Sequence, residues 1–203
     1  NNARDALGTA MYRAGIDVNT TDHADWQQAL QALVDQRPLV KSYVMDEIYN
    51  MMESGEAAVA AYYAGDYFTM CDAQADSVDL QFYYPENTNY FIDAMCIPTS
   101  CRDQELAECF INFMLSREAA AANAEYIYYA SPNRLVYDDP EYIDDMGEDT
   151  MAILYPDIGS FRDAYNRSAY RNLDQDTLTY VNSLWETLKI LSLIHISEPT
   201  RRS

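Results

Sequence analysis

Two short apolar runs, each lying between helix-forming segments, constrain the fold of this chain most. Residues 57–63 read Ala-Ala-Val-Ala-Ala-Tyr-Tyr, and residues 91–98 read Phe-Ile-Asp-Ala-Met-Cys-Ile-Pro. Apolar runs of this length are typical of strands that are buried on both faces of a parallel sheet. A third short strand is expected near Val78–Phe82. With the helices around them, these runs predict an α/β fold with a mostly parallel sheet.

Helix-start and helix-stop signals surround these runs. Asn2 precedes a helix expected over residues 3–14, which Gly15 ends. Residues 20–22 (Thr-Thr-Asp), followed by Asp25, open a second helix that residues 36–38 (Gln-Arg-Pro) stop. Further helices are expected over residues 44–54, from about 66, over 103–115, 117–126, 140–146 and 149–154, and from 172 or 174 through 188. In the helix over residues 103–115, the side chains expected to face the core are those of Leu106, Phe110, Phe113 and Met114.

The charge and cysteine content exclude several classes of function. The chain has 33 acidic and 13 basic residues, a formal net charge of -20, which repels nucleic acid and draws small cations. A role in solubility alone is the alternative reading. The four cysteines contain no Cys-x-x-Cys pair and only two histidines are present, so we expect no metal and no cofactor. A Cys96–Cys101 disulfide stays open.

Both ends of the sequence differ from its middle. The sequence begins with Asn1 in place of Met and passes at once into a helix-start signal, so we interpret it as cut at its N-terminus. Residues 191–203 lack the acidic, Tyr-rich character of the preceding residues and resemble translated sequencing-adapter read-through. We expect this tail to be non-native, with a genuine basic extension as the alternative. No apolar run approaches transmembrane length.

Aromatic and acidic residues recur together without an accompanying catalytic group. Residues 62–67 read Tyr-Tyr-Ala-Gly-Asp-Tyr, and residues 90–93 read Tyr-Phe-Ile-Asp. The face of an aromatic ring attracts an ammonium group, and a carboxylate adds a charge-assisted hydrogen bond. Asp93 lies in an otherwise apolar run, where a carboxylate needs a partner or a cleft; a helix cap or a salt bridge to an arginine is the alternative. The pattern favours binding of an organic cation over catalysis.

Four segments in this order resemble the spermidine/putrescine-binding proteins of bacterial ABC importers, which are two-lobed type II periplasmic binding proteins. The segments are residues 62–67, 91–98, 129–133 and 155–157. The resemblance covers nearly all of residues 1–190 and corresponds to the C-terminal part of such a protein. It implies two lobes with mostly parallel sheets, with the first lobe largely missing. It assigns residues 1–90 and 138–190 to the second lobe and residues 91–137 to a segment that returns to the first.

The same resemblance implies a ligand site, position by position. Asp93 matches the family's anchor for a substrate amine, and the family's pair of carboxylates at the start of the second lobe falls on Asn2 and Asp5, so one charge is lost. This loss favours putrescine over spermidine. A polar family position falls on Arg171, whose charge does not favour an amine. The residues implied at the site are Asp93, Phe91, Tyr63, Tyr129, Asp5, Asn2, Tyr170 and Arg171.

The function implied by the resemblance is capture of a polyamine by lobe closure, followed by docking on the permease subunits of an ABC transporter. It also implies a monomer that is not an enzyme, located in the periplasm or at the outer face of the bacterial membrane, with lipoprotein anchoring left open. One alternative is a binding protein for another small solute such as a sugar. A weaker alternative is a hydrolase that uses the Asp5 and Asp93 carboxylates, since no nucleophile elbow accompanies these residues. A purely structural role is a further weaker alternative.

Overall fold

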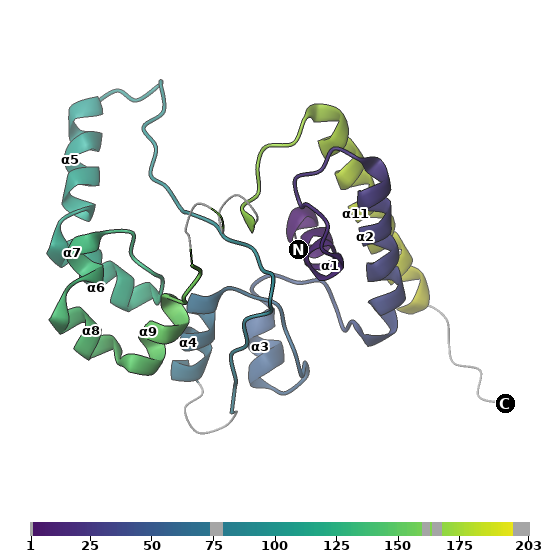
Figure 1. Ribbon diagram of the computed structural model, residues 1–203, viewed down its shortest axis with the longest axis horizontal. Coiled ribbons are helices and arrows are strands. Elements are labelled where there is room, and N and C mark those ends of the chain that lie inside the picture. Colours follow the sequence, from purple (N-terminus) through teal and green to yellow (C-terminus); the bar gives the residue numbers. More distant parts are fainter. Residues whose placement is uncertain (1, 74–78, 160–162, 164–167, 197–203) are drawn as a thin grey trace. The chain divides into compact units, whose positions relative to one another are not determined.

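The computed structural model describes residues 2–73, 79–159, 163 and 168–196, with residues 192–196 described by their backbone (Figure 1). The chain divides into two compact units. Unit 1 contains residues 1–46, 84–91 and 159–203, and unit 2 contains residues 47–83 and 92–158. The lobe boundaries implied by the family resemblance stay a prediction.

Unit 1 is built on three helices that pack on one another: α1 (Ala3–Ala14), α2 (His23–Gln36) and α11 (Gln175–Ile196), with a short 3-10 turn, η1 (Arg37–Leu39), after α2. The Asn2 side chain accepts a hydrogen bond from the backbone N–H of Arg4 at 2.9 Å and caps α1. Gly15 ends α1 at φ 68°, a left-handed conformation that suits glycine. Asp22 caps α2 in the same way as Asn2 caps α1. The predicted helices at these two places are confirmed.

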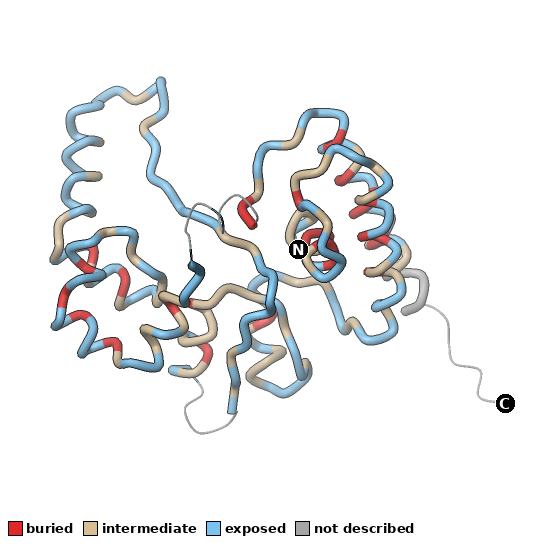
Figure 2. The backbone as a smooth tube through the Cα atoms, viewed as in Figure 1, coloured by how far each residue is buried: buried red, intermediate tan, exposed pale blue. Residues whose placement is uncertain are grey.

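The core of unit 1 lies where these three helices meet (Figure 2). Trp26 of α2 is fully buried, and its indole N–H donates to the Thr20 carbonyl at 3.0 Å, so burial leaves no unsatisfied donor there. The other side chains with no exposed surface in this cluster are Leu7, Met11, Val18, Val181 and Leu188. Burial of such side chains contributes roughly 1.5–3 kcal/mol each.

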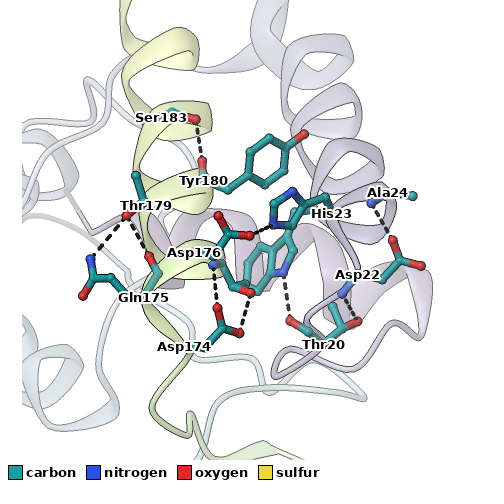
Figure 3. Close-up of polar contacts among 12 residues, drawn as sticks. Thr20, Asp22, His23, Ala24, Asp174, Gln175, Asp176, Thr179, Tyr180 and Ser183 are labelled. Atoms are coloured by element: carbon teal, nitrogen blue, oxygen red, sulfur yellow. Dashed lines mark hydrogen bonds and ion pairs between the residues drawn. The ribbon is translucent and has the colours of Figure 1, made fainter.

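Polar contacts fix the N-terminal turn of α11 against α2 (Figure 3). The His23 ring stacks on the Tyr180 ring with centroids 3.9 Å apart, and its Nε2 lies 3.5 Å from the Asp176 carboxylate. The Asp174 carboxylate accepts from the backbone N–H of Thr177 at 2.9 Å and from its hydroxyl at 2.7 Å. These hydrogen bonds hold the pKa of Asp174 below its usual range. The last helix therefore begins just after Asp174, one of its two predicted starts.

Unit 2 consists of short helices joined by extended segments (Figure 1). Its core gathers the buried side chains of Ala120, Ala124, Val136, Tyr142, Met146 and Leu154. Helix α3 is shorter than the predicted helix over residues 44–54. The helices of the unit are α3 (Ile48–Glu53), α4 (Ala64–Ala73), α5 (Gln104–Met114), α6 (Arg117–Ile127), α7 (Arg134–Tyr137), α8 (Pro140–Met146) and α9 (Glu148–Leu154).

The predicted strands are not observed in the part of the chain that the structure describes. Residues 57–63 and 91–98 form no strand, and neither do residues 79–82, while Val78 lies outside the described residues. The prediction of mostly parallel sheets is therefore wrong for the described residues. A strand becomes stable only when a neighbour pairs with its backbone N–H and C=O groups. Val59 is 88% exposed and Ile92 is 55% exposed, so these runs are not buried as predicted.

The apolar face of α5 is also exposed, contrary to prediction (Figure 2). Leu106, Phe110 and Phe113 are 66%, 58% and 62% exposed. The helix itself forms as predicted, since Asp103 caps it through the backbone N–H of Leu106 at 2.9 Å. The amphipathic pattern thus identified the apolar face correctly, but no described element covers that face.

Candidate functional site

The predicted site residues of unit 1 gather beside the N-terminal end of α1. The Asp5 carboxylate accepts a hydrogen bond from the Tyr170 hydroxyl. Tyr170 also packs closely on α1, because a Cβ placed on Gly8 would lie only 2.5 Å from its hydroxyl oxygen. The Tyr12 hydroxyl belongs to the same network and donates to the Ser168 carbonyl at 2.6 Å. The structure therefore brings together Asp5 and Tyr170, two of the predicted site residues.

Burial controls the ionisation of this group. Burial raises the pKa of the Asp5 carboxyl, and the hydrogen bond from Tyr170 and the nearby Arg4 charge offset only part of that rise. Burial also raises the pKa of Tyr12 to about 12 and raises that of Tyr170. Both hydroxyls therefore remain protonated donors at neutral pH. They can stabilise an anionic Asp5, and they add no negative charge of their own.

Arg4 was missed by the sequence reasoning. Its guanidinium lies 4.6 Å from the centre of the Tyr170 ring. It donates to the carbonyls of Arg171 at 3.2 Å and Val18 at 3.0 Å and to the Asn19 side chain at 3.1 Å. Three acceptors and an aromatic face are the surroundings that a bound organic cation prefers. The chain's own cation therefore occupies one face of Tyr170, which a reading of isolated motifs did not anticipate.

Unit 2 contains a second carboxylate framed by tyrosines. Asp66 lies in the first turn of α4, where the helix dipole favours a negative charge. The Tyr129 hydroxyl donates to Asp66 Oδ2 at 2.9 Å, and the Tyr49 hydroxyl donates to Oδ1. Burial and the Asp66 contact raise the pKa of both tyrosines. Both hydroxyls thus remain protonated donors, and these two hydrogen bonds use only part of the carboxylate's capacity of about four acceptor sites.

Tyr63 lies close to this carboxylate and its partners. Its ring is 5.1 Å from that of Tyr62, which in turn lies edge-on to Tyr49 at 6.0 Å, and Tyr63 is close enough to Tyr129 to interact with it electrostatically. The structure therefore brings together Tyr63 and Tyr129, two predicted site residues, around Asp66.

Gly65 allows this close approach. A Cβ at Gly65 would lie 2.7 Å from the Tyr128 carbonyl oxygen and would overlap the Tyr129 ring. Only a residue without a side chain fits between α4 and the segment that carries Tyr129. The order Tyr-Tyr-Ala-Gly-Asp-Tyr was a visible signal in the sequence. The importance of Asp66 was missed because its tyrosine partners lie 17 and 63 residues away.

The remaining predicted residues are more exposed. Asp93 is an exposed residue of unit 2, and in the described part of the chain no arginine pairs with it. This exposure corrects the prediction of a carboxylate in a buried strand. Phe91 is 44% exposed in unit 1. Asn2 serves as a helix cap, and the backbone N–H of Arg171 donates to Asn19 at 2.7 Å. Each unit carries part of the predicted site, and its assembly stays a prediction.

The described residues form no cluster of metal-ligating side chains and no disulfide. Among the described residues, no three His, Cys, Asp or Glu side chains converge as metal ligands. All four cysteines are free thiols, so the open question of a Cys96–Cys101 disulfide is answered in the negative for this structure. A search of the described helices finds none that is long and apolar enough to cross a bilayer.

Comparison with known proteins establishes the family. The family model described as bacterial extracellular solute-binding protein matches residues 1–148. The chain belongs to this family. Spermidine/putrescine-binding periplasmic protein 1 of Haemophilus influenzae is 30% identical over 132 residues, which are 64% of this chain and 36% of that protein. The putrescine/cadaverine-binding protein of Pseudomonas aeruginosa is 25% identical over 193 residues, which are 92% of this chain and 52% of that protein.

A solved structure shows the same fold. The crystal structure of the substrate-binding protein of a spermidine/putrescine ABC transporter from Streptococcus pneumoniae matches with a TM-score of 0.76 and 26% identity. The match covers 95% of this chain and 57% of that one. The chain thus has the fold of the matched part of that substrate-binding protein, and it spans between about a third and somewhat over half of the length of these relatives.

Proposed function

We propose that the chain is part of an extracytoplasmic protein that captures polyamines for an ABC importer. The observation that carries this proposal is the Asp66 carboxylate, held by the hydroxyls of Tyr49 and Tyr129 with Tyr63 beside them. Relatives in this solute-binding family are named for spermidine, putrescine and cadaverine, which are all extended organic cations. The chemistry of the site and the names of the relatives point to the same class of ligand.

A polyamine has charged ends and an apolar middle, and a binding site must suit both. Each ammonium must lose water, which costs several kcal/mol unless a carboxylate receives it. Asp66 supplies a carboxylate with free lone pairs, and a ring face adds roughly 0.5–2 kcal/mol per contact. The methylene chain between the ammonium groups gains about 0.8 kcal/mol per buried CH2 by leaving water, and it packs against the rings of Tyr63 and Tyr129.

The finer features remain part of the proposal. Asp93 is proposed as the anchor of a second amine because an exposed carboxylate without an arginine partner is available to a ligand. With Asn2 in place of a carboxylate, the site favours the two charges of putrescine over the three of spermidine. Docking on permease subunits, a monomeric state, a periplasmic or membrane-facing location and the absence of enzymatic activity follow from the family resemblance.

Isothermal titration of the chain with putrescine and spermidine tests the proposal. We expect saturable binding of both amines, tighter for putrescine, and no heat with maltose. Asp66→Asn and Asp93→Asn should each weaken binding at least tenfold, about 1.4 kcal/mol. Asp144→Asn is the matched control, since Asp144 is an exposed carboxylate on α8 outside the site.

Four outcomes contradict parts of this proposal. Binding of maltose without binding of either amine contradicts the polyamine assignment, and no binding of any amine contradicts it for this chain. Equal losses in Asp66→Asn and Asp144→Asn show that the amines respond to net charge and not to a site. Much tighter binding of spermidine contradicts the preference inferred from Asn2.

A further inference from the structure

A second set of rings and carboxylates lines an open pocket of unit 2, and the Asp66 carboxylate is not part of that lining. The pocket has a volume of about 390 Å³ and is formed by α4, α6, α8 and α9, which pack together in this unit (Figure 1). Its volume falls within the range of small-molecule sites, about 300–1,000 Å³. The residues that line it are Phe68, Asp72, Glu125, Tyr128, Asp145, Met146 and Thr150.

One wall of the pocket is a rigid aromatic pair. The rings of Phe68 and Tyr128 stack with centroids 5.2 Å apart and planes 27° apart. The Tyr128 hydroxyl donates to Asp72 Oδ2 at 2.8 Å, and this hydrogen bond is the main cause that raises the pKa of the Tyr128 phenol. The wall therefore presents aromatic surface and a carboxylate in fixed relation, with the phenol protonated at neutral pH.

Tyr128 stands where a helix usually ends in glycine. It caps α6 with φ 53° and is the one residue other than glycine with positive φ in the described part of the chain. A side chain in this conformation costs free energy, which glycine avoids. The stack on Phe68 and the bond to Asp72 hold the residue there. Tyr128 thus carries an aromatic side chain at a position whose backbone conformation favours glycine.

The charge of the lining is negative and is not balanced from within the pocket. Asp72, Glu125 and Asp145 contribute carboxylates, and no basic side chain lines the pocket. The described basic residues of unit 2 are Arg102, Arg117 and Arg134. Arg117 pairs with Asp139 and Glu141, and Arg134 pairs with Asp138. The pocket therefore attracts a cation from solution.

The arrangement selects an organic cation over a metal ion. Three carboxylates that converged on one point would suit calcium, but no such group of ligands occurs among the described residues. The carboxylates instead stand around a surface that includes two rings and the Met146 side chain. From this juxtaposition we infer that the pocket is a second binding site, which takes a small organic ammonium ion with an apolar body.

Amide chemical shifts in a putrescine titration at low salt provide the test, because they separate the two sites of the chain. The pocket inference predicts saturable shifts at Phe68, Tyr128 and Thr150, with half-saturation on the order of 1 mM or below. The double variant Glu125→Gln/Asp145→Asn should weaken this titration at least about tenfold, because it removes two of the three charges and leaves the stacked rings in place. Asp144→Asn, the exposed neighbour of Asp145 on α8, should change it less than about twofold.

The readout at Tyr63 and Asp66 reports separately on the proposed polyamine site. Shifts at the pocket that persist in Asp66→Asn support the second site even if the residues around Asp66 do not respond. The inference is overturned if the amides of the pocket show no saturable shift. It is also overturned if Asp144→Asn weakens the titration as much as the double variant does, because the amine then responds only to the diffuse negative field of the chain. Displacement of putrescine by an equal concentration of calcium chloride overturns the assignment to an organic cation and assigns a divalent ion instead.

Discussion

The hydroxyl of Tyr129 gives the most direct test of how the Asp66 group is held. Tyr129→Phe keeps the ring and removes the 2.9 Å hydrogen bond to Asp66 Oδ2. A hydrogen bond to a charged group contributes about 1.5–3 kcal/mol. We expect the low end, about 1.5 kcal/mol, because Asp66 is half-buried and keeps the bond from Tyr49. For a unit of about 100 residues this loss lowers the midpoint of thermal unfolding by roughly 6 °C.

The assay is thermal and urea unfolding followed by circular dichroism, with Tyr126→Phe as the matched control. Tyr126 is 86% exposed, so loss of its hydroxyl should change the free energy of unfolding by less than about 0.5 kcal/mol. Asp66→Asn and the double variant complete a cycle. A coupling free energy of at least about 0.5 kcal/mol is expected between the two residues, which are in direct contact. Additive effects, or equal effects of Tyr129→Phe and Tyr126→Phe, refute the assigned role of this hydrogen bond.

Three further predictions concern other parts of the chain. Burial raises the pKa of Asp5, so the stability linked to this group is present below its ordinary pKa and is lost as pH rises through the raised value. Asp5→Asn should therefore unfold at a higher temperature than the parent at pH 7 and at the same temperature as the parent at pH 3. A lower unfolding temperature of Asp5→Asn at pH 7 contradicts the raised pKa. Asp22→Ala should lower the free energy of unfolding by about 1 kcal/mol, measured in urea, while Asp22→Ser keeps the cap and most of the stability. Phe110→Ser should leave that free energy within about 0.5 kcal/mol of the parent, because the Phe110 side chain is exposed, whereas Leu154→Ala in the core should lower it by about 2–5 kcal/mol.

Local signals in the sequence predicted helices well. The first helix has the predicted bounds because Asn2 caps it and Gly15 ends it, and both effects involve residues next to the helix end. Asp103 starts α5 for the same reason. The boundary of α3 was less accurate, since no side-chain cap holds its N-terminus.

Features that depend on distant partners were not predictable in this way. An apolar run such as residues 57–63 has the composition of a strand, but pairing requires a neighbour that local composition does not supply. The exposed face of α5 shows the same limit, because periodicity identifies an apolar face and not its cover. The Asp66 group unites residues up to 63 positions apart, and only the order of residues 62–67 was visible in the sequence.

The two units differ in the groups that contact their aromatic rings and carboxylates. This difference bears on which unit attracts an amine more strongly. In unit 1 the face of Tyr170 already carries the Arg4 guanidinium, which is held by backbone and side-chain acceptors and stays charged at any physiological pH. A diffusing amine would have to displace it. In unit 2 the partners of Asp66 and Asp72 are tyrosine hydroxyls, which donate hydrogen bonds without neutralising charge.

A neutral donor orients a carboxylate and leaves its charge for a third group, whereas an arginine cancels that charge. We therefore expect unit 2 to attract an amine more strongly than the Asp5 and Tyr170 group of unit 1 does.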